Sequence, residues 1–267
     1  MAAAAKPLDV LRAFIADERD RFVTRDNNLF STAFSDLVRY RRFLQRIEGR
    51  HMLISQEFVA SAQAMLARLT ESSGPRPMTA VDMAVLDARE ELGLALQLEI
   101  ESFYLFAKIL LDEVARAIEF YFGPVPKLAL DSHDDLTKRI ERYAAQHQVT
   151  LPTGFTKRAE QLKSDVSDYR DQQIAHHKNP RTIRGIGYNQ EGTTRMVLSP
   201  LYPKESDKQA ETRALHELLV DIDGYLLSIV DFLRANSERT RLEVEPKPER
   251  LGGGPLSESP PRAPSRL

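Results

Sequence analysis

Apolar residues recur at every third or fourth position through most of the chain, the period of α-helices that bury one face. The first such segment begins at Pro7, a first-turn position that suits proline, and its apolar side carries Leu8, Leu11, Phe14, Ile15 and Phe22. The sequence DNN at 26–28 predicts a break and a helix cap. A second stripe follows, made of Phe30, Phe34, Leu37, Val38, Leu44 and Ile47. Gly49 is expected to separate it from a further helical segment over 51–69.

A long helix is predicted in the middle of the chain. Residues 71–77 (ESSGPRP) have the composition of a loop, and Thr79 and Asp82 then have the spacing of a capping box. No proline occurs from Thr79 to Phe122, which would span about 66 Å as an unbroken helix. Its apolar stripe consists of Leu96, Ile100, Phe103, Phe106, Leu110, Val114, Ala117 and Tyr121. Gly93 is the expected bend, and GPVP at 123–126 ends the helix.

Three further helices are predicted. Asp131 or Ser132 caps the first of them, whose inner side carries Leu136, Ile140 and Tyr143. The second begins near Thr153, and its apolar residues follow the seam of a packed bundle helix: Phe155, Ala159, Leu162, Val166 and Tyr169. The last runs from about residue 205 to 236, and its inner side carries Ala214, Leu218, Ile222, Tyr225, Ile229 and Phe232.

Two segments depart from the helical pattern. In the segment 182–203 helix-forming residues are scarce, and β-branched residues stand on both sides of a turn at NQEG, which predicts a small β-hairpin. From about residue 244 the chain is rich in Pro, Gly and Ser, which predicts a disordered tail over 244–267. The expected fold class is therefore all-α, with N-terminal helices over 1–70 that pack on a helical bundle over 79–236.

Composition narrows the functional classes. The 267 residues are 42% hydrophobic and 28% charged, enough for a sizeable core under a solvated surface. A net charge of −2 argues against a surface coated for nucleic-acid binding, although it leaves room for a local basic cleft. The absence of cysteine excludes disulfides, thiolate metal sites and cysteine nucleophiles. No signal peptide and no apolar run of about 18 residues occur, so a cytoplasmic protein without a membrane partner is expected.

The candidate chemistry lies in YRDQQIAHH at 169–177. At 100° per residue, Arg170 and His177 fall within about 20° of each other, on the arc that carries the apolar seam. His176 lies at the edge of that arc near Tyr169, and Asp171 points elsewhere. The C-terminus of a helix favours a protonated histidine, and a guanidinium binds phosphate in a bidentate manner. This arrangement suits metal-independent cleavage of an RNA phosphodiester, in which a histidine transfers protons.

This stretch resembles the signature of the HEPN family (higher eukaryote and prokaryote nucleotide-binding domains), in its abortive-infection-like branch. That signature is an arginine, often a polar residue next to it, then four to six residues and a histidine. The resemblance implies an all-α bundle over roughly 79–236 and, in many members, a ribonuclease of a defence or toxin–antitoxin system. It also implies a homodimer that joins two motifs in one cleft, an RNA substrate and an antitoxin partner. The implied catalytic residues are Arg170, His176 and His177, supported by Asp171 and Tyr169, with neither metal nor cofactor.

An alternative from another class is a non-catalytic interaction or nucleotide-binding module. In that case the histidines cap the end of their helix, and Arg170 pairs with a carboxylate of the long helix: Glu99, Glu101 or Asp112. Two weaker candidates lie elsewhere. His133 stands among three aspartates, an arrangement that fits either a metal site or an ordinary acidic helix start. RYRRF at 39–43 places arginines among aromatic residues, which fits either a phosphate-binding surface or a solvated helix face.

Overall fold

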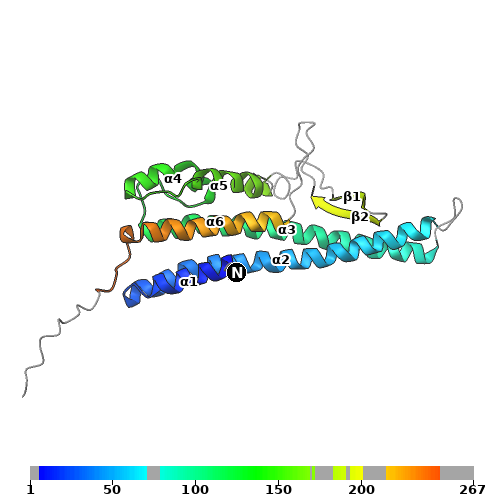
Figure 1. Cartoon of the computed structure of the whole chain (residues 1–267), viewed down its shortest axis with the longest axis horizontal. Helices are drawn as coiled ribbons and strands as arrows, with labels where there is room; N and C mark the ends of the chain where they lie inside the picture. The colour runs from blue at the N-terminus through cyan, green and yellow to red at the C-terminus, as the bar shows by residue number, and fades with distance from the viewer. Residues whose placement is uncertain are drawn as a thin grey trace, which may run out of the picture.

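The computed structural model of the protein describes residues 6–70, 79–168, 170–171, 183–190, 193–200 and 215–246 (Figure 1). This part is mostly helical, so the predicted all-α class is confirmed. The helices are α1 (Pro7–Arg19), α2 (Thr24–Thr70), α3 (Ala80–Phe122), α4 (His133–His147), α5 (Phe155–Leu162) and α6 (Leu215–Ala235). A π-helical segment, η1 (Lys163–Asp168), continues α5, and a short 3₁₀ turn (Ser237–Arg239) follows α6.

The helices α2 and α3 form a long antiparallel pair that runs the length of the molecule (Figure 1). They have 47 and 43 residues, and α2 continues through Gly49, so the predicted separation there is wrong; α3 likewise continues through Gly93, where a bend was expected. A glycine inside a helix costs only about 1 kcal/mol, and apolar side chains on the same helices bury against the partner helix. Leu44, Ile47 and Leu96 are examples of such buried side chains. Tertiary packing therefore overrides the local signal.

The turn between α1 and α2 also differs from the prediction. The chain breaks at residues 20–23, before the expected DNN sequence at 26–28, which lies inside α2. Phe22, expected on the first helix, lies in this turn and is 2% exposed. The side-chain amide of Asn27 donates to the carbonyl of Arg19 at 3.2 Å and thereby joins the end of α1 to the start of α2. Phenylalanine burial and this polar contact fix the turn.

Several predicted helix ends are confirmed. Thr79 and Asp82 form a capping box at the start of α3, and the Ser132 side chain accepts the amide of Asp135 at the start of α4. Gly123, with φ of 102°, follows the end of α3 at Phe122. These caps satisfy backbone groups that have no partner within the helix.

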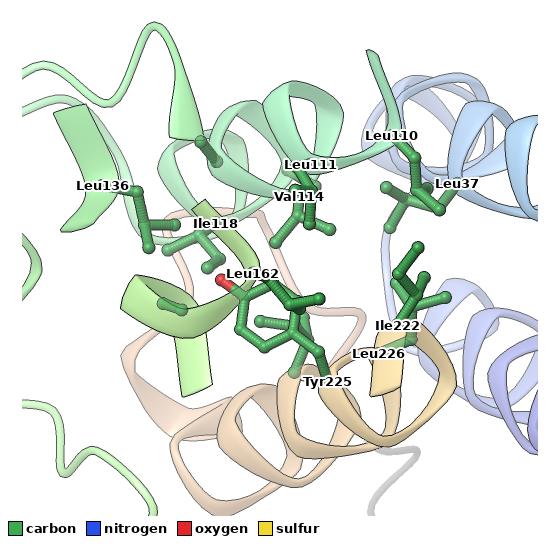
Figure 2. Close-up of a cluster of buried hydrophobic side chains, with 14 of the residues drawn as sticks. Leu37, Leu110, Leu111, Val114, Ile118, Leu136, Leu162, Ile222, Tyr225 and Leu226 are labelled. Atoms are coloured by element: carbon green, nitrogen blue, oxygen red, sulfur yellow. The ribbon is translucent and has the colours of Figure 1, made fainter. Parts of the chain in front are cut away.

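One continuous hydrophobic core joins α1 to α6 around the half of the long pair that holds the start of α2 and the end of α3. Figure 2 shows its centre, with side chains from five helices: Leu37, Leu110, Leu111, Val114, Ile118, Leu136, Leu162, Ile222, Tyr225 and Leu226. Most of the predicted inner residues of α3, α4, α5 and α6 belong to it. Phe106 is partly buried against it, Leu96 is buried outside it, and Tyr169 and Ala214 lie outside the described residues. The N-terminal helices and the later helices therefore share one core.

The other half of the α2–α3 pair extends beyond the four shorter helices (Figure 1). It leaves large apolar side chains exposed, namely Met52, Leu53, Val81, Met83, Leu94 and Leu98. The strands β1 (Ile183–Gln190) and β2 (Thr193–Pro200) pair antiparallel beside the long helices, within residues 182–203. Their register places Gln190 opposite Thr193 and Ile183 opposite Pro200.

The chain after α6 returns to the α1–α2 turn. Val244 forms an antiparallel bridge with Phe22, the amide of Val23 donates to Glu243, and the amide of Glu245 donates to Arg21. Leu242 is 7% exposed, and the amide of Arg241 donates to the carbonyl of Tyr121 at the end of α3. We call residues 240–245 the C-terminal strap. The folded part therefore continues past residue 244, where the sequence placed the start of the tail; residues 247–267 lie outside the described residues.

Candidate functional site

The helix that carries the predicted motif is built by α5 and η1. Gly154, with φ of 75°, precedes α5, and the buried seam of Phe155, Ala159, Leu162 and Val166 packs it into the core as predicted. The α5 part contacts α4 and α6, whereas η1 contacts α3 and α4. The end of this helix is thus held against α3, and it leads directly to Arg170.

The helix changes from α to π at Lys163, and Arg170 and Asp171 also lie in π-helical conformation. A π turn closes hydrogen bonds five residues apart, so it holds more residues per turn than an α-helix. The predicted angle of about 20° between Arg170 and His177 assumed a regular α-helix. That assumption does not hold for residues 163–168 and 170–171, and residues 172–177 lie outside the described residues. Single π turns inside helices occur frequently at functional sites.

Arg170 donates to the Asp171 carboxylate at 2.7 Å, and the two side chains are 38% and 45% exposed. The guanidinium was expected on the arc that carries the apolar seam. It is instead in contact with solvent, with its neighbour as partner. An exposed pair of this kind contributes at most about 1 kcal/mol. A phosphate can therefore displace Asp171 from Arg170 at little cost.

The carboxylates proposed as structural partners of Arg170 have other contacts. Glu99 accepts from Arg50 at 3.0 Å, Glu101 accepts from Gln97 at 2.9 Å, and Asp112 accepts from Lys108 at 2.8 Å. Within the described residues Arg170 pairs with Asp171, and not with the long helix as the alternative proposed. Tyr169, His176 and His177 lie outside the described residues.

His133 has a structural environment. It is the first residue of α4, its ring is fully buried, and Nε2 lies 3.2 Å from the hydroxyl of Tyr225. Its backbone amide donates to Asp112 at 2.8 Å. Burial is the main cause that lowers the pKa of His133, to about 3, and the positive charge of Lys108 contributes as well. The ring is therefore neutral near pH 7. Among the described residues no group of three or more His, Asp or Glu side chains could hold a metal ion. Asp134 and Asp135 lie in the first turn of α4, where carboxylates interact favourably with the helix dipole.

The sequence RYRRF divides between the core and the surface. Arg41 is buried and forms a double hydrogen bond with Asp223 of α6, including Nη2 to Oδ2 at 2.6 Å. Arg39 and Arg42 are exposed. Sequence reasoning missed the buried pair, although Arg41 stands four residues after Leu37 and three before Leu44, on the buried stripe itself. A charged residue on an apolar stripe indicates a buried partner, because an unpaired buried charge is costly.

Comparisons of the chain with protein-family models, with curated proteins and with solved structures found no match. None of the described helices is both long enough and apolar enough to cross a membrane.

Proposed function

We propose that the protein is HEPN-like and cleaves RNA without a metal ion, with Arg170, His176 and His177 as its catalytic residues. The observation that carries this proposal is the sequence RDQQIAHH, whose first residue, Arg170, follows a packed bundle helix and has a guanidinium that contacts solvent. A guanidinium locked to a buried carboxylate would not reach a phosphate. Among the described residues the partner of Arg170 is Asp171, which is 45% exposed and which a phosphate can replace.

The reaction uses this motif as follows. One histidine takes the proton of the ribose 2′-hydroxyl, and the 2′-oxygen attacks the neighbouring phosphorus. The bond from phosphorus to the 5′-oxygen breaks, and a second imidazolium gives that oxygen its proton. The products are a 2′,3′-cyclic phosphate and a 5′-hydroxyl. Arg170 binds the non-bridging oxygens and stabilises their growing negative charge, with Asp171 and Tyr169 in support.

A homodimer follows from the same proposal. One motif supplies few groups for a phosphate and two proton transfers, and a two-fold axis brings the same helix end from each copy together. The seam of this dimer lies near Arg170 to His177. An antitoxin-type protein that covers the cleft is the further partner that a defence or toxin–antitoxin role requires.

One observation favours a second candidate function, a non-catalytic interaction module. The extended half of the α2–α3 pair exposes Leu94 and Leu98 at 56% and 64%, beyond the shorter helices. Exposed apolar side chains gathered on one element mark interaction surfaces. In this candidate the Arg170–Asp171 pair holds the helix end and performs no chemistry.

Cleavage of single-stranded RNA by the purified full chain tests the proposal. Arg170→Ala, and separately the double change His176→Ala with His177→Ala, are each expected to abolish cleavage while thermal unfolding stays cooperative. The products should end in 2′,3′-cyclic phosphate, and a chelator should leave the rate unchanged. Arg158→Ala is the matched control on α5, because Arg158 is exposed and donates to the backbone of Gly224. Undiminished cleavage by the double histidine variant would overturn the assignment of the catalytic histidines, and no cleavage by the unaltered chain would favour the interaction module.

A further inference from the structure

An arginine stripe covers the outer face of α2. Arg39, Arg42, Arg46 and Arg50 are all exposed, with spacings of three, four and four residues. At 100° per residue they occupy an arc of about 80°, and they extend over about 16 Å of helix. Leu37 and Leu44 lie on the opposite side of α2, in the core. The stripe is thus the solvent face of the helix.

The stripe keeps a net positive charge. Arg39 pairs with Asp36 and Arg50 with Glu99, both at 3.0 Å, whereas Arg42 and Arg46 have no carboxylate within 4.0 Å among the described residues. The Arg39–Asp36 pair is partly exposed and therefore weak, whereas Glu99, the partner of Arg50, is buried. Guanidinium groups stay protonated at any working pH. A polyanion therefore meets Arg42 and Arg46, which have no carboxylate partner among the described residues, Arg39, which can change partner, and the exposed side chain of Arg50, which keeps its buried partner Glu99.

This spacing has a cost for folding. Solvated helix faces usually place opposite charges four residues apart, whereas Arg42 and Arg46, and Arg46 and Arg50, are like-charged pairs at that spacing. Like charges four residues apart destabilise a helix. These like-charged pairs do not stabilise the helix, so stability does not account for them. A negatively charged ligand that binds the arginines would account for them.

An aromatic cluster adjoins the stripe. Phe43, 37% exposed, lies between Arg42 and Arg46 in the chain, and its ring centroid lies 5.3 Å from that of Phe106 on α3 and 5.9 Å from that of Tyr40. The Arg39 guanidinium lies over the Tyr40 ring at 4.8 Å. Single-stranded nucleic acids are bound by basic surfaces with aromatic rings on which bases stack. A purely acidic peptide would use the arginines but not the exposed ring.

We infer that this outer face of α2, with Arg39, Arg42, Phe43, Arg46 and Arg50, binds single-stranded RNA. The identity of the RNA as the substrate rests on the proposed function. In Figure 1, α3 and α6 separate α2 from α5, so the stripe is a second anchoring surface, distinct from the Arg170 motif. It holds the strand through phosphates, which makes binding salt-dependent and tolerant of sequence.

RNA binding by the full chain tests this inference. The background is Arg170→Ala, which prevents cleavage, and the probe is a fluorescent single strand of about 20 nucleotides, longer than one binding site for a single strand. Arg42→Gln with Arg46→Gln should weaken binding on the order of tenfold and lower the slope of log affinity against log salt by about 1.4, about 0.7 for each lost phosphate contact. Thermal stability of this variant should be equal to or above that of the background, since a like-charged pair is removed.

Lys138→Gln with Arg142→Gln is the matched control. Both residues are exposed, stand four apart on α4 and change the net charge equally. This control should bind RNA as the background does. Equal weakening by both variants, or none by the α2 variant, overturns the inference, as does tighter binding of polyglutamate or of phosphatidylserine vesicles to the stripe. Cleavage by the unaltered chain is measured separately. If the chain cleaves RNA but the α2 variant binds RNA normally, only this inference is contradicted. If binding depends on the stripe but the chain does not cleave RNA, only the proposed function is contradicted.

Discussion

At the scale of single residues, His133 couples folding to pH. Its folded pKa of about 3 lies below the value of 6.5 for a free side chain. Above pH 6.5 the ring is neutral in both states and folding is unaffected. As the pH falls from 6.5 toward 3, the unfolded chain binds a proton that the folded chain does not. Stability should therefore fall by up to about 1.4 kcal/mol per pH unit within this window.

Urea unfolding at several pH values between 7 and 4.5 measures this slope. His133→Gln should reduce the dependence on pH, although it also lowers stability through its unfilled contacts with Tyr225. His216→Gln is the control, because His216 is 72% exposed and lies 3.5 Å from Glu48. If the slopes of the chain and of the His133 variant agree, the buried ring does not carry the pH dependence.

Residues differ in how far the sequence predicts their role. The apolar spacing identified core positions such as Phe155 and Ile222, because burial on a helix repeats with the helix. The same spacing places Arg41 on the buried stripe, but its partner Asp223 stands 182 positions later, and a single sequence holds no signal for that contact. Arg170 was expected on the core side and is half-exposed, since the π turns of η1 have no recognised sequence pattern.

At the scale of elements, Gly49 tests the continuity of α2. A Cβ atom added there meets nothing within 4 Å, and alanine costs less backbone entropy than glycine inside a helix. Gly49→Ala should raise the free energy of unfolding by about 0.5–1 kcal/mol, which is a rise of about 2 °C in Tm. Calorimetry of the full chain measures it. No gain, or a loss, would indicate a break at Gly49.

Gly123 gives the opposite case at the end of α3. Its φ of 102° is strained for any residue with a side chain, and an added Cβ would lie 3.3 Å from Cδ of Arg241. Gly123→Ala should therefore lower Tm. The contrast between the two glycines separates helix propensity from a general effect of alanine.

Helix ends and helix continuity were predicted with different success for a physical reason. The caps at Thr79 and Ser132 depend on residues three positions apart, which a sequence displays directly. Continuity through Gly49 and Gly93 depends on the partner helix, because the α2–α3 contact supplies the stability that glycine lacks locally. The two strands fall within residues 182–203, where loss of helix formers and the NQEG turn indicated a hairpin.

At the scale of the whole molecule, the fold is closed by contacts between its ends. The C-terminal strap joins the α1–α2 turn to the end of α3, through Val244 with Phe22 and Arg241 with Tyr121. The sequence indicated a featureless tail from residue 244, because a single bridge with a strand partner over 200 positions away leaves no periodic pattern. Leu242 is 7% exposed and is the one apolar residue of the strap that belongs to the core.

Two truncations separate the strap from the residues that follow it. A chain that ends at Pro246 keeps the strap, and its Tm should stay nearly unchanged, because residues 247–267 have a composition that cannot bury enough apolar surface to offset ordering. A chain that ends at Arg239 loses the burial of Leu242 and the backbone hydrogen bonds to Val23, Arg21 and Tyr121. It should lose about 3 kcal/mol, and its Tm should fall on the order of 5–10 °C.

Acid pH supplies an independent check on the strap. The amide of Glu243 donates to Asp26 at 2.8 Å, and this hydrogen bond, as the largest cause, lowers the pKa of Asp26 below its ordinary 3.8. The contact therefore stabilises the fold above about pH 4, and the stability is lost as the pH falls through the lowered pKa. The chain that ends at Arg239 lacks the contact, so its stability should fall less steeply between pH 5 and 3 than that of the chain that ends at Pro246. Equal Tm values and equal acid slopes for the two chains would show that residues 240–245 pack without holding the α1–α2 turn to α3.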